Sequence, residues 1–273
     1  MKSGNAELNL RGTSRPWPVF RKSWFLGMVI LAALAGVMLQ KPLAQDPAYH
    51  HFADQRTFLG LSRALDSLSN VSFLIAGAAG LAALTLKRFR AGAVFADPRE
   101  RVPYLVFFGG MALIALGSFY YHLQPDNQRL LWDRLPMAVA FMALLSAVIS
   151  ERLGISAGLK SLVPLLLLGT GSVLYWYVTE TMGLGDLRPY GLVQFLPMIL
   201  IPLLLILYRS RYSGAGYLCL ALAIYALAKL FELWDREVLE YTALVSGHTV
   251  KHLLAAFGAG IILFMLRARR IIR

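Results

Sequence analysis

The chain has 273 residues, of which 58% are hydrophobic and only 15% are charged, and its mean hydropathy is +0.59. This balance excludes an ordinary soluble domain. A formal net charge of +12 is typical of nucleic-acid-binding proteins, but here most basic residues fall in loops on one side of a membrane, which argues against that role.

Eight apolar segments follow in chain order, and each is predicted to be a membrane-spanning helix. About 20 helical residues cross about 30 Å of hydrocarbon, and no segment has the alternating pattern of a membrane barrel strand. The sequence therefore predicts an all-α, polytopic membrane helix bundle. The predicted spans are 24–39, 68–86, 102–121, 135–150, 161–179, 189–208, 212–228 and 242–266.

The first span follows several basic residues and so resembles a signal peptide. Pro42 makes the sequence Pro42-Leu43-Ala44 a poor cleavage site, and we expect a retained anchor instead. Loops are short and no repeat is present. Residues 1–273 are therefore predicted to form a single membrane domain, in which 24–39 is an extra helix before a seven-helix core at 66–267.

The basic residues predict the orientation. Of the 27 Lys and Arg residues, 18 lie in segments that would share one side of the membrane: 1–23, 87–101, 151–160, 209–211 and 267–273. The positive-inside rule places these segments, and both termini, in the cytoplasm. We expect a multi-pass protein of a bacterial inner (cell) membrane.

Three of the five histidines follow a pattern that metal sites in membranes use. His122 comes four residues after Ser118, and His248 and His252 lie four apart in the last span. Residues four apart stack on one helix face. Three imidazoles from two helices match the ligand set of a catalytic zinc ion, with the fourth position open for water. Ionisable groups inside a membrane segment are costly to keep, so they usually have a function. With this set of metal ligands, the pattern favours a metal-dependent membrane hydrolase.

The predicted topology brings an aspartate to the same side. Asp133 opens the fourth span, and 11 of the 15 acidic residues fall on the outer side with the histidines. Each part also has a structural interpretation. His122 alone is typical of an interfacial hydrogen bonder, Asp133 of a helix start, and Ser118 of a helix contact.

Other polar residues have less specific roles. Lys251 points about 100° away from His252 on a helix, so we expect it to pair with Glu232 or Asp235, or else to contact a substrate. His50 and His51 are expected in a solvated loop.

These residues resemble the alkaline ceramidase family, within the superfamily of seven-helix membrane hydrolases that includes the adiponectin-type receptors. The superfamily pattern is Ser-x-x-x-His, a following Asp, and a terminal His-x-x-x-His. Two further runs resemble the ceramidase branch, and the match covers roughly residues 50–267. They are Asp133-Arg134-Leu135-Pro136-Met137 and Asp66-Ser67-Leu68-Ser69-Asn70.

The resemblance implies one Zn²⁺ per chain, held by His122, His248 and His252, which lowers the pKa of a bound water toward about 7. Asp133 would accept a proton from that water and deliver one to the leaving amine. Ser118 would donate a hydrogen bond to the oxyanion or to the water. The implied reaction is hydrolysis of the N-acyl (carbon–nitrogen) bond of a ceramide-like membrane lipid.

Two features depart from the family's pattern. An acidic residue often stands where this chain has Arg134, and the family's acidic Ca²⁺ cluster is represented only by Asp54 and Asp66. These departures concern lipid specificity and the calcium site rather than the zinc site.

Four alternatives remain at this point. The chain could hydrolyse an ester of another acyl lipid, or act as a lipid-sensing receptor that keeps the zinc. It could bind haem through His122 and one histidine of the last span. It could also be a transporter with a proton relay of Asp133, Lys251 and Glu232, although no repeat or paired broken helices are present.

Overall fold

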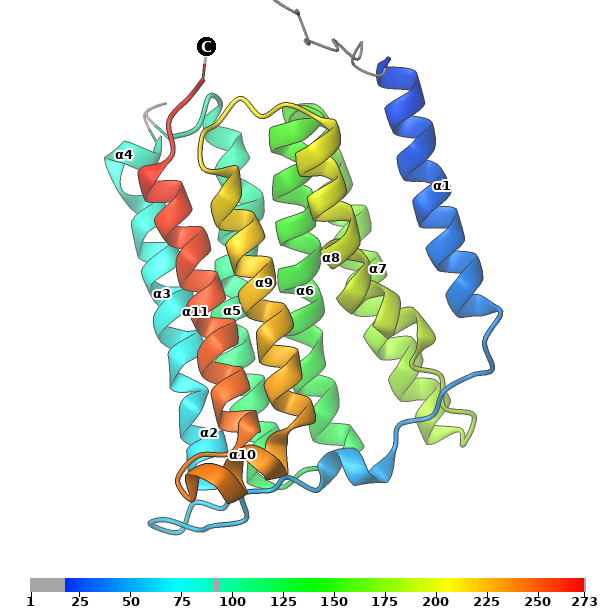
Figure 1. Cartoon of the computed structure of the whole chain (residues 1–273), viewed down its shortest axis with the longest axis vertical. Helices are drawn as coiled ribbons and strands as arrows, with labels where there is room; N and C mark the ends of the chain where they lie inside the picture. The colour runs from blue at the N-terminus through cyan, green and yellow to red at the C-terminus, as the bar shows by residue number, and fades with distance from the viewer. Residues whose placement is uncertain (1–17, 91–93, 273) are drawn as a thin grey trace, which may run out of the picture.

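The computed structural model describes residues 18–90 and 94–272, and these form a membrane helix bundle without a β-sheet (Figure 1). Eight spans in this part of the chain are long and apolar enough to cross a membrane, as the sequence predicted. The helices are α1 (Val19–Met38), α2 (Ala64–Ser69), α3 (Val71–Thr85), α4 (Lys87–Arg90), α5 (Arg101–Leu123), α6 (Asn127–Arg152), α7 (Ile155–Thr181), α8 (Arg188–Leu207), α9 (Ala215–Leu233), α10 (Asp235–Thr242) and α11 (Gly247–Ala268).

The bundle is built around α5 and α6. Helix α5 packs between α3 and α6, α6 packs on α7 and α8, and α11 packs on α9 and α3. The largest buried share of any span belongs to α6. Because α11 lies beside α3, the last span closes the bundle against the first core span.

Helix α1 stands at the edge of the bundle, with its main contact on α8 (Figure 1). None of its residues is buried. Its apolar surface therefore faces mostly lipid, as expected for a helix added to a bundle rather than built into it.

The largest difference between a predicted and an observed helix boundary is at α6, which begins at Asn127 rather than near residue 135. Asp133 therefore lies in the second turn of α6 instead of opening the helix. The reason is local, since Arg129, Asp133 and Arg134 lower the hydropathy of turns that are nevertheless helical. Asp126 caps the start, accepting a hydrogen bond from the Arg129 amide at 2.7 Å.

The two ends of the bundle are chemically different. At one end, called here the histidine end, α5 finishes and α11 begins. At the other end, a buried ion pair of Arg269 and Glu151 joins α6 to the residue that follows α11, and the Tyr104 hydroxyl of α5 donates to Glu151 at 2.7 Å. These contacts connect α5, α6 and α11 at the end of the bundle opposite the histidines.

Candidate metal centre

The three histidines predicted to bind metal meet inside the bundle. One ligating atom from each of His122, His248 and His252 lies within 4.8 Å of the others, and all three side chains are buried. Their ring centroids are 4.6 to 5.1 Å apart. In the part of the chain that the structure describes, no other group of His, Cys, Asp or Glu side chains forms such a cluster. The three histidines can hold a metal ion.

Close helix packing brings His122 to this position. A Cβ added at Gly117 would lie 2.1 Å from the Trp132 carbonyl oxygen, so only glycine allows α5 to approach α6 here. Gly117 immediately precedes Ser118, and Trp132 immediately precedes Asp133. The contact therefore fixes the distance between the two helices at the level of the candidate catalytic residues.

A second glycine, Gly247, allows α11 to approach α9 closely. A Cβ at Gly247 would lie 2.1 Å from the Phe231 carbonyl oxygen of α9. The Asp235 carboxylate accepts hydrogen bonds from the amide of His248 at 2.7 Å and from the amide of Ala53 at 2.9 Å. The start of α11 is thus held against both α9 and the loop that precedes α2.

The end of α5 has its own anchor. Arg63 donates hydrogen bonds from Nε to the His122 carbonyl at 2.8 Å and from Nη2 to the Leu123 carbonyl at 2.9 Å. The last carbonyls of a helix have no partner within the helix, and a cation is favoured beside them. Arg63 therefore stabilises the turn that carries His122.

Ser69 sets which nitrogen of His252 is available. Its hydroxyl donates to the Asp66 carbonyl at 2.8 Å and lies 2.8 Å from Nδ1 of His252. A hydroxyl has one proton to donate, so the serine oxygen accepts a hydrogen bond from the Nδ1–H group. Nε2 is then left with a free lone pair, as a metal ligand requires.

Asp66 supports the same turn of α11. One carboxylate oxygen accepts hydrogen bonds from the hydroxyls of Ser246 and Thr249, each at 2.6 Å. Ser246 is also the N-cap of α11, accepting the Thr249 amide at 2.9 Å. The start of α2 and the start of α11 are therefore bonded directly to each other.

His122 gives the clearest indication of a bound ion. It is fully buried, and neither ring nitrogen has a hydrogen-bond partner in the part of the protein that is described. A buried polar group without a partner costs about 1–3 kcal/mol, and such groups are rare in native proteins. A metal ion on the imidazole would remove this cost, so the donor set fits a metal.

Phe52 covers the histidines. This residue belongs to the loop between α1 and α2, and its ring centroid lies 4.5 Å from those of both His122 and His248. The ring centroid of Phe73, in α3, lies 5.6 Å from that of His252. The two aromatic rings limit the access of water to the centre.

Asp133 and Ser118 lie beside the centre without joining its ligand cluster. Both are buried, and the Ser118 hydroxyl lies next to the Asp133 carboxylate. Both line the same internal cavity as His252. The structure therefore brings together all five residues that the sequence singled out: three histidines that can hold a metal, with one carboxylate and one hydroxyl beside them.

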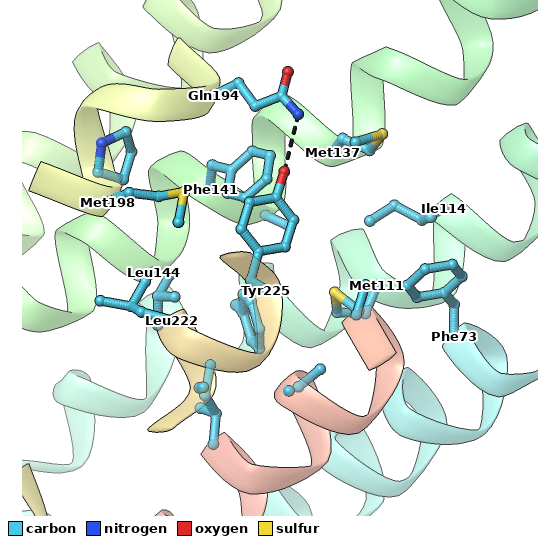
Figure 2. A pocket seen from close by; sticks show the side chains of 18 of the residues that line it. Phe73, Met111, Ile114, Met137, Phe141, Leu144, Gln194, Met198, Leu222 and Tyr225 are labelled. Carbon is cyan, nitrogen blue, oxygen red and sulfur yellow. Dashed lines mark hydrogen bonds between the residues drawn. The ribbon is translucent and has the colours of Figure 1, made fainter. Parts of the chain in front are cut away.

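The cavity is mostly apolar and has a volume of about 110 Å³. It follows α5, α6 and α11 from Ser118, Asp133 and Lys251 down to Phe107, Leu144 and Ile262. The two ends of each stretch are 11 positions apart, which corresponds to about 16 Å at 1.5 Å per residue. Figure 2 shows the apolar side chains around it, and the one hydrogen bond drawn there joins Gln194 to Tyr225 at 2.9 Å.

Three charged side chains form a cluster at the histidine end of this cavity. Lys251 forms an ion pair with Glu232 at 2.7 Å, which is one of the two pairings expected from the sequence. Lys229 forms a second ion pair with the same carboxylate. Both lysines also line the cavity. Lys251 Nζ lies 3.5 Å from Nε2 of His248, so this group borders the metal centre.

The other two histidines lie outside the three-histidine cluster. His50 lies 2.9 Å from the Tyr121 hydroxyl and 3.0 Å from the Asn127 side-chain oxygen, and His51 is exposed. His50 is more enclosed than a solvated loop residue, and burial lowers its pKa.

The two residues considered for calcium are already engaged. Two guanidinium nitrogens of Arg56 donate hydrogen bonds to the two carboxylate oxygens of Asp54. This contact holds the pKa of the Asp54 carboxyl below its usual value. Asp66 accepts from Ser246 and Thr249, and neither aspartate belongs to a metal-sized cluster in residues 18–90 and 94–272.

Sequence reasoning missed the residues that support the histidines. Phe52 and Arg63 carry no recognisable signal. Ser69 and Asp66 belong to the run that resembles the ceramidase branch, but their hydrogen bonds to α11 were not predicted. The glycines immediately before Ser118 and His248 were a usable signal, because a glycine inside an apolar helix marks a close helix approach.

No protein-family model matches this chain, and no curated protein matches it at a significant level.

Proposed function

We propose that the protein is a zinc-dependent integral-membrane hydrolase that cleaves the N-acyl bond of ceramide-like lipids. The observation that carries this proposal is the position of the three buried histidines at one end of a long apolar cavity, with Asp133 and Ser118 beside them. The resemblance to the alkaline ceramidases agrees with it, because the same residues form the family's motif.

The cavity supports a lipid substrate. Its length of about 16 Å is close to the thickness of one leaflet of the hydrocarbon core, which is about half of 30 Å. An acyl chain in this cavity would lie between Phe107 and Ser118 along α5, with its carboxyl carbon at the polar end. Binding the chain inside the bundle would replace one apolar environment by another, so the polar contacts at the histidine end decide the position of the lipid.

The metal would be held by His122, His248 and His252, and zinc suits three neutral nitrogen ligands. Zinc bound in this way supplies Lewis acidity and a water whose pKa falls toward about 7. Ser69 orients the ring of His252, and Arg63 holds the turn that carries His122. These residues position the ligands without contacting substrate.

Asp133 is the proposed general acid and base. Hydrolysis adds the oxygen of a water molecule to the acyl carbon, breaks the carbon–nitrogen bond and transfers a proton to the leaving amine. Asp133 would take the proton from water and give it to the nitrogen. Ser118 lies next to Asp133 and would donate a hydrogen bond to the oxygen of the acyl group as charge develops on it.

The alternatives differ in how well the geometry supports them. An ester substrate would use the same residues, so it remains the nearest alternative, followed by a lipid-sensing receptor that keeps the metal. Haem binding is less compatible, because a porphyrin would need to separate two axial imidazoles, whereas the three histidine rings contact one another.

The proposed orientation has both termini in the cytoplasm of a bacterial cell and the histidine end outward, because 18 of 27 basic residues then lie inside. Reporter fusions after Arg273 and in the turn at 126–129 test it, and they should report opposite compartments. A cytoplasmic turn at 126–129 would reverse the orientation.

The reaction is tested with purified protein and a panel of fluorescent acyl lipids that share one acyl chain. The panel contains an amide with a sphingoid base, an amide with a simple amine and the corresponding ester. Release of fatty acid from the sphingoid amide, blocked by a zinc chelator and restored by zinc, is expected. Hydrolysis of the ester alone would replace the proposed substrate class.

A further inference from the structure

A second hollow lies on the outside of the bundle, between α1 and α8. It has a volume of about 1080 Å³, and α1 contributes no buried residue that would close it. Apolar side chains such as Val37, Phe195 and Ile199 line it. Its wall at the histidine end carries Lys41, Arg134 and Arg188. The groove is therefore apolar along its length and basic at one end.

Arg134 is the unusual residue of this groove. Its exposed fraction is 5%. Its Nη2 donates to the Gln45 side-chain oxygen at 2.7 Å, but Nη1 has no acceptor, and none of the ion pairs found in residues 18–90 and 94–272 includes it. The indole nitrogen of Trp176, a buried neighbour, also lacks a partner.

Three aromatic rings surround the guanidinium. Its carbon Cζ lies 4.2 Å from a Trp176 ring centroid, 4.9 Å from that of Tyr190 and 5.4 Å from that of Tyr49. Such contacts offset part of the cost of burying a cation, but they provide no oxygen acceptor. A buried guanidinium with an unused donor is suited to a phosphate or carboxylate group.

The nearby acidic residues do not neutralise this charge. Asp186 forms an ion pair with Arg188 at 2.8 Å, and Glu180 accepts the Gln45 amide at 3.0 Å. Asp133 precedes Arg134 but lines the internal cavity instead of the groove. With Arg188 neutralised by Asp186, Arg134 and Lys41 leave an excess of positive charge at the histidine end of the groove.

We propose that this groove binds one anionic phospholipid, with its phosphate on Arg134 and Lys41 and an acyl chain between α1 and α8. The membrane determines the occupant, because lipid chains surround the protein in the hydrocarbon region and can fill an apolar groove there. The basic end determines the head group, since basic pockets between membrane helices select anionic lipids. This inference does not depend on the proposed hydrolase activity.

The lipid would lie next to the catalytic cavity but outside it. Gln194 lines both hollows, and its side chain donates to Tyr225 on the cavity side. The bound phospholipid would therefore fill the gap between α1 and α8 and support the wall of the cavity at this point.

The test measures binding of fluorescent phosphatidylglycerol and fluorescent phosphatidylcholine with the same chains to the full-length protein in neutral detergent. Wild type should bind phosphatidylglycerol about tenfold or more tightly, because the choline cation offsets the phosphate charge of phosphatidylcholine, whereas phosphatidylglycerol keeps a net negative charge for Arg134 and Lys41. Arg134→Gln should remove this preference. Arg129→Gln is the matched control, because it removes a positive charge from the same end of α6 but outside the groove.

A second pair of variants keeps the test informative if Arg134→Gln does not fold. Gly36 and Gly191 line the groove from opposite helices, and a Cβ at either position meets no atom within 4 Å. Gly36→Leu and Gly191→Leu should therefore fold and reduce the binding of both lipids by filling the groove. Equal affinity of wild type for the two lipids, or unchanged binding in both leucine variants, would overturn the proposal. Competition by inorganic phosphate at the same affinity as the lipid would also overturn it, because the site would then bind a free anion.

Discussion

Asp133 and Arg134 are neighbours in the sequence but face two different hollows of the protein. Asp133 lines the internal cavity with the candidate metal centre, and Arg134 lines the groove between α1 and α8. The angle of about 100° between successive helical residues allows this division. One turn of α6 thus carries a candidate catalytic carboxylate on one face and a candidate lipid-binding cation on another.

Ser69→Ala should weaken metal binding without removing a ligand. The variant loses the oxygen that accepts the Nδ1 proton of His252, and loss of such a partner costs about 10–100-fold in metal affinity. Zinc affinity is measured by competition with a chromogenic chelator. Ser72→Ala is the control, because that hydroxyl lies one turn along and donates only to the Ser69 carbonyl. Equal affinity of the two variants would remove Ser69 from the site.

Gly117→Ala should destabilise the protein and disturb the centre, although it adds only a methyl group. Its Cβ would lie 2.1 Å from the Trp132 carbonyl oxygen, and overpacking of this kind costs about 1–3 kcal/mol. Thermal unfolding in detergent and zinc content are the measurements. Gly109→Ala on the same helix meets no atom within 4 Å and should leave both unchanged. A wild-type melting temperature for Gly117→Ala would show that α5 and α6 are farther apart.

Asp133→Asn should keep the metal and lose turnover, because Asp133 lies outside the three-histidine cluster. Loss of a general acid and base typically costs about 10²–10⁴ in rate. Ser118→Ala should cost less, since a second water can partly replace one hydroxyl. Zinc content and the initial rate on a fluorescent N-acyl lipid are measured together. If Asp133→Asn loses zinc, Asp133 is a ligand, and if it keeps full activity, Asp133 has no part in the reaction.

Ala259→Phe should shift the substrate preference toward shorter acyl chains. Ala259 lines the cavity about two turns below His252, and an aromatic side chain there would fill the space of the distal part of the chain. Rates on a series of amides that differ only in acyl length provide the measurement. Leu253→Phe adds bulk to the exposed, lipid-facing side of the same helix and should not change the profile. The same chain-length profile in Ala259→Phe and wild type would mean that the acyl chain lies elsewhere.

The spans and the histidine cluster could be predicted from the sequence for the same physical reason. A membrane requires about 20 apolar residues for each helix, and the exceptions to that rule, such as His248 and His252, stand out against them. Helix periodicity then placed both histidines on one face. The start of α6 could not be predicted, because Asp133 and Arg134 interrupt the apolar pattern while their turns stay helical.

The surroundings of the site depend on contacts between distant segments, and no local pattern reports these. Phe52 reaches the histidines from a loop, and Ser69 meets His252 across 183 positions of sequence. The groove beside α8 exists because α1 packs only along one edge of the bundle, which hydropathy does not reveal.

The metal content of the purified protein tests the central claim most directly, measured for wild type and the His248→Ala/His252→Ala double variant. The double variant should keep its fold, because α11 is also held by Ser246, Asp66 and Gly247, and circular dichroism checks this. The account predicts about one zinc per wild-type chain and almost none in the double variant. Full zinc occupancy in a folded double variant, or a wild-type protein that binds no zinc when the metal is supplied, would contradict it.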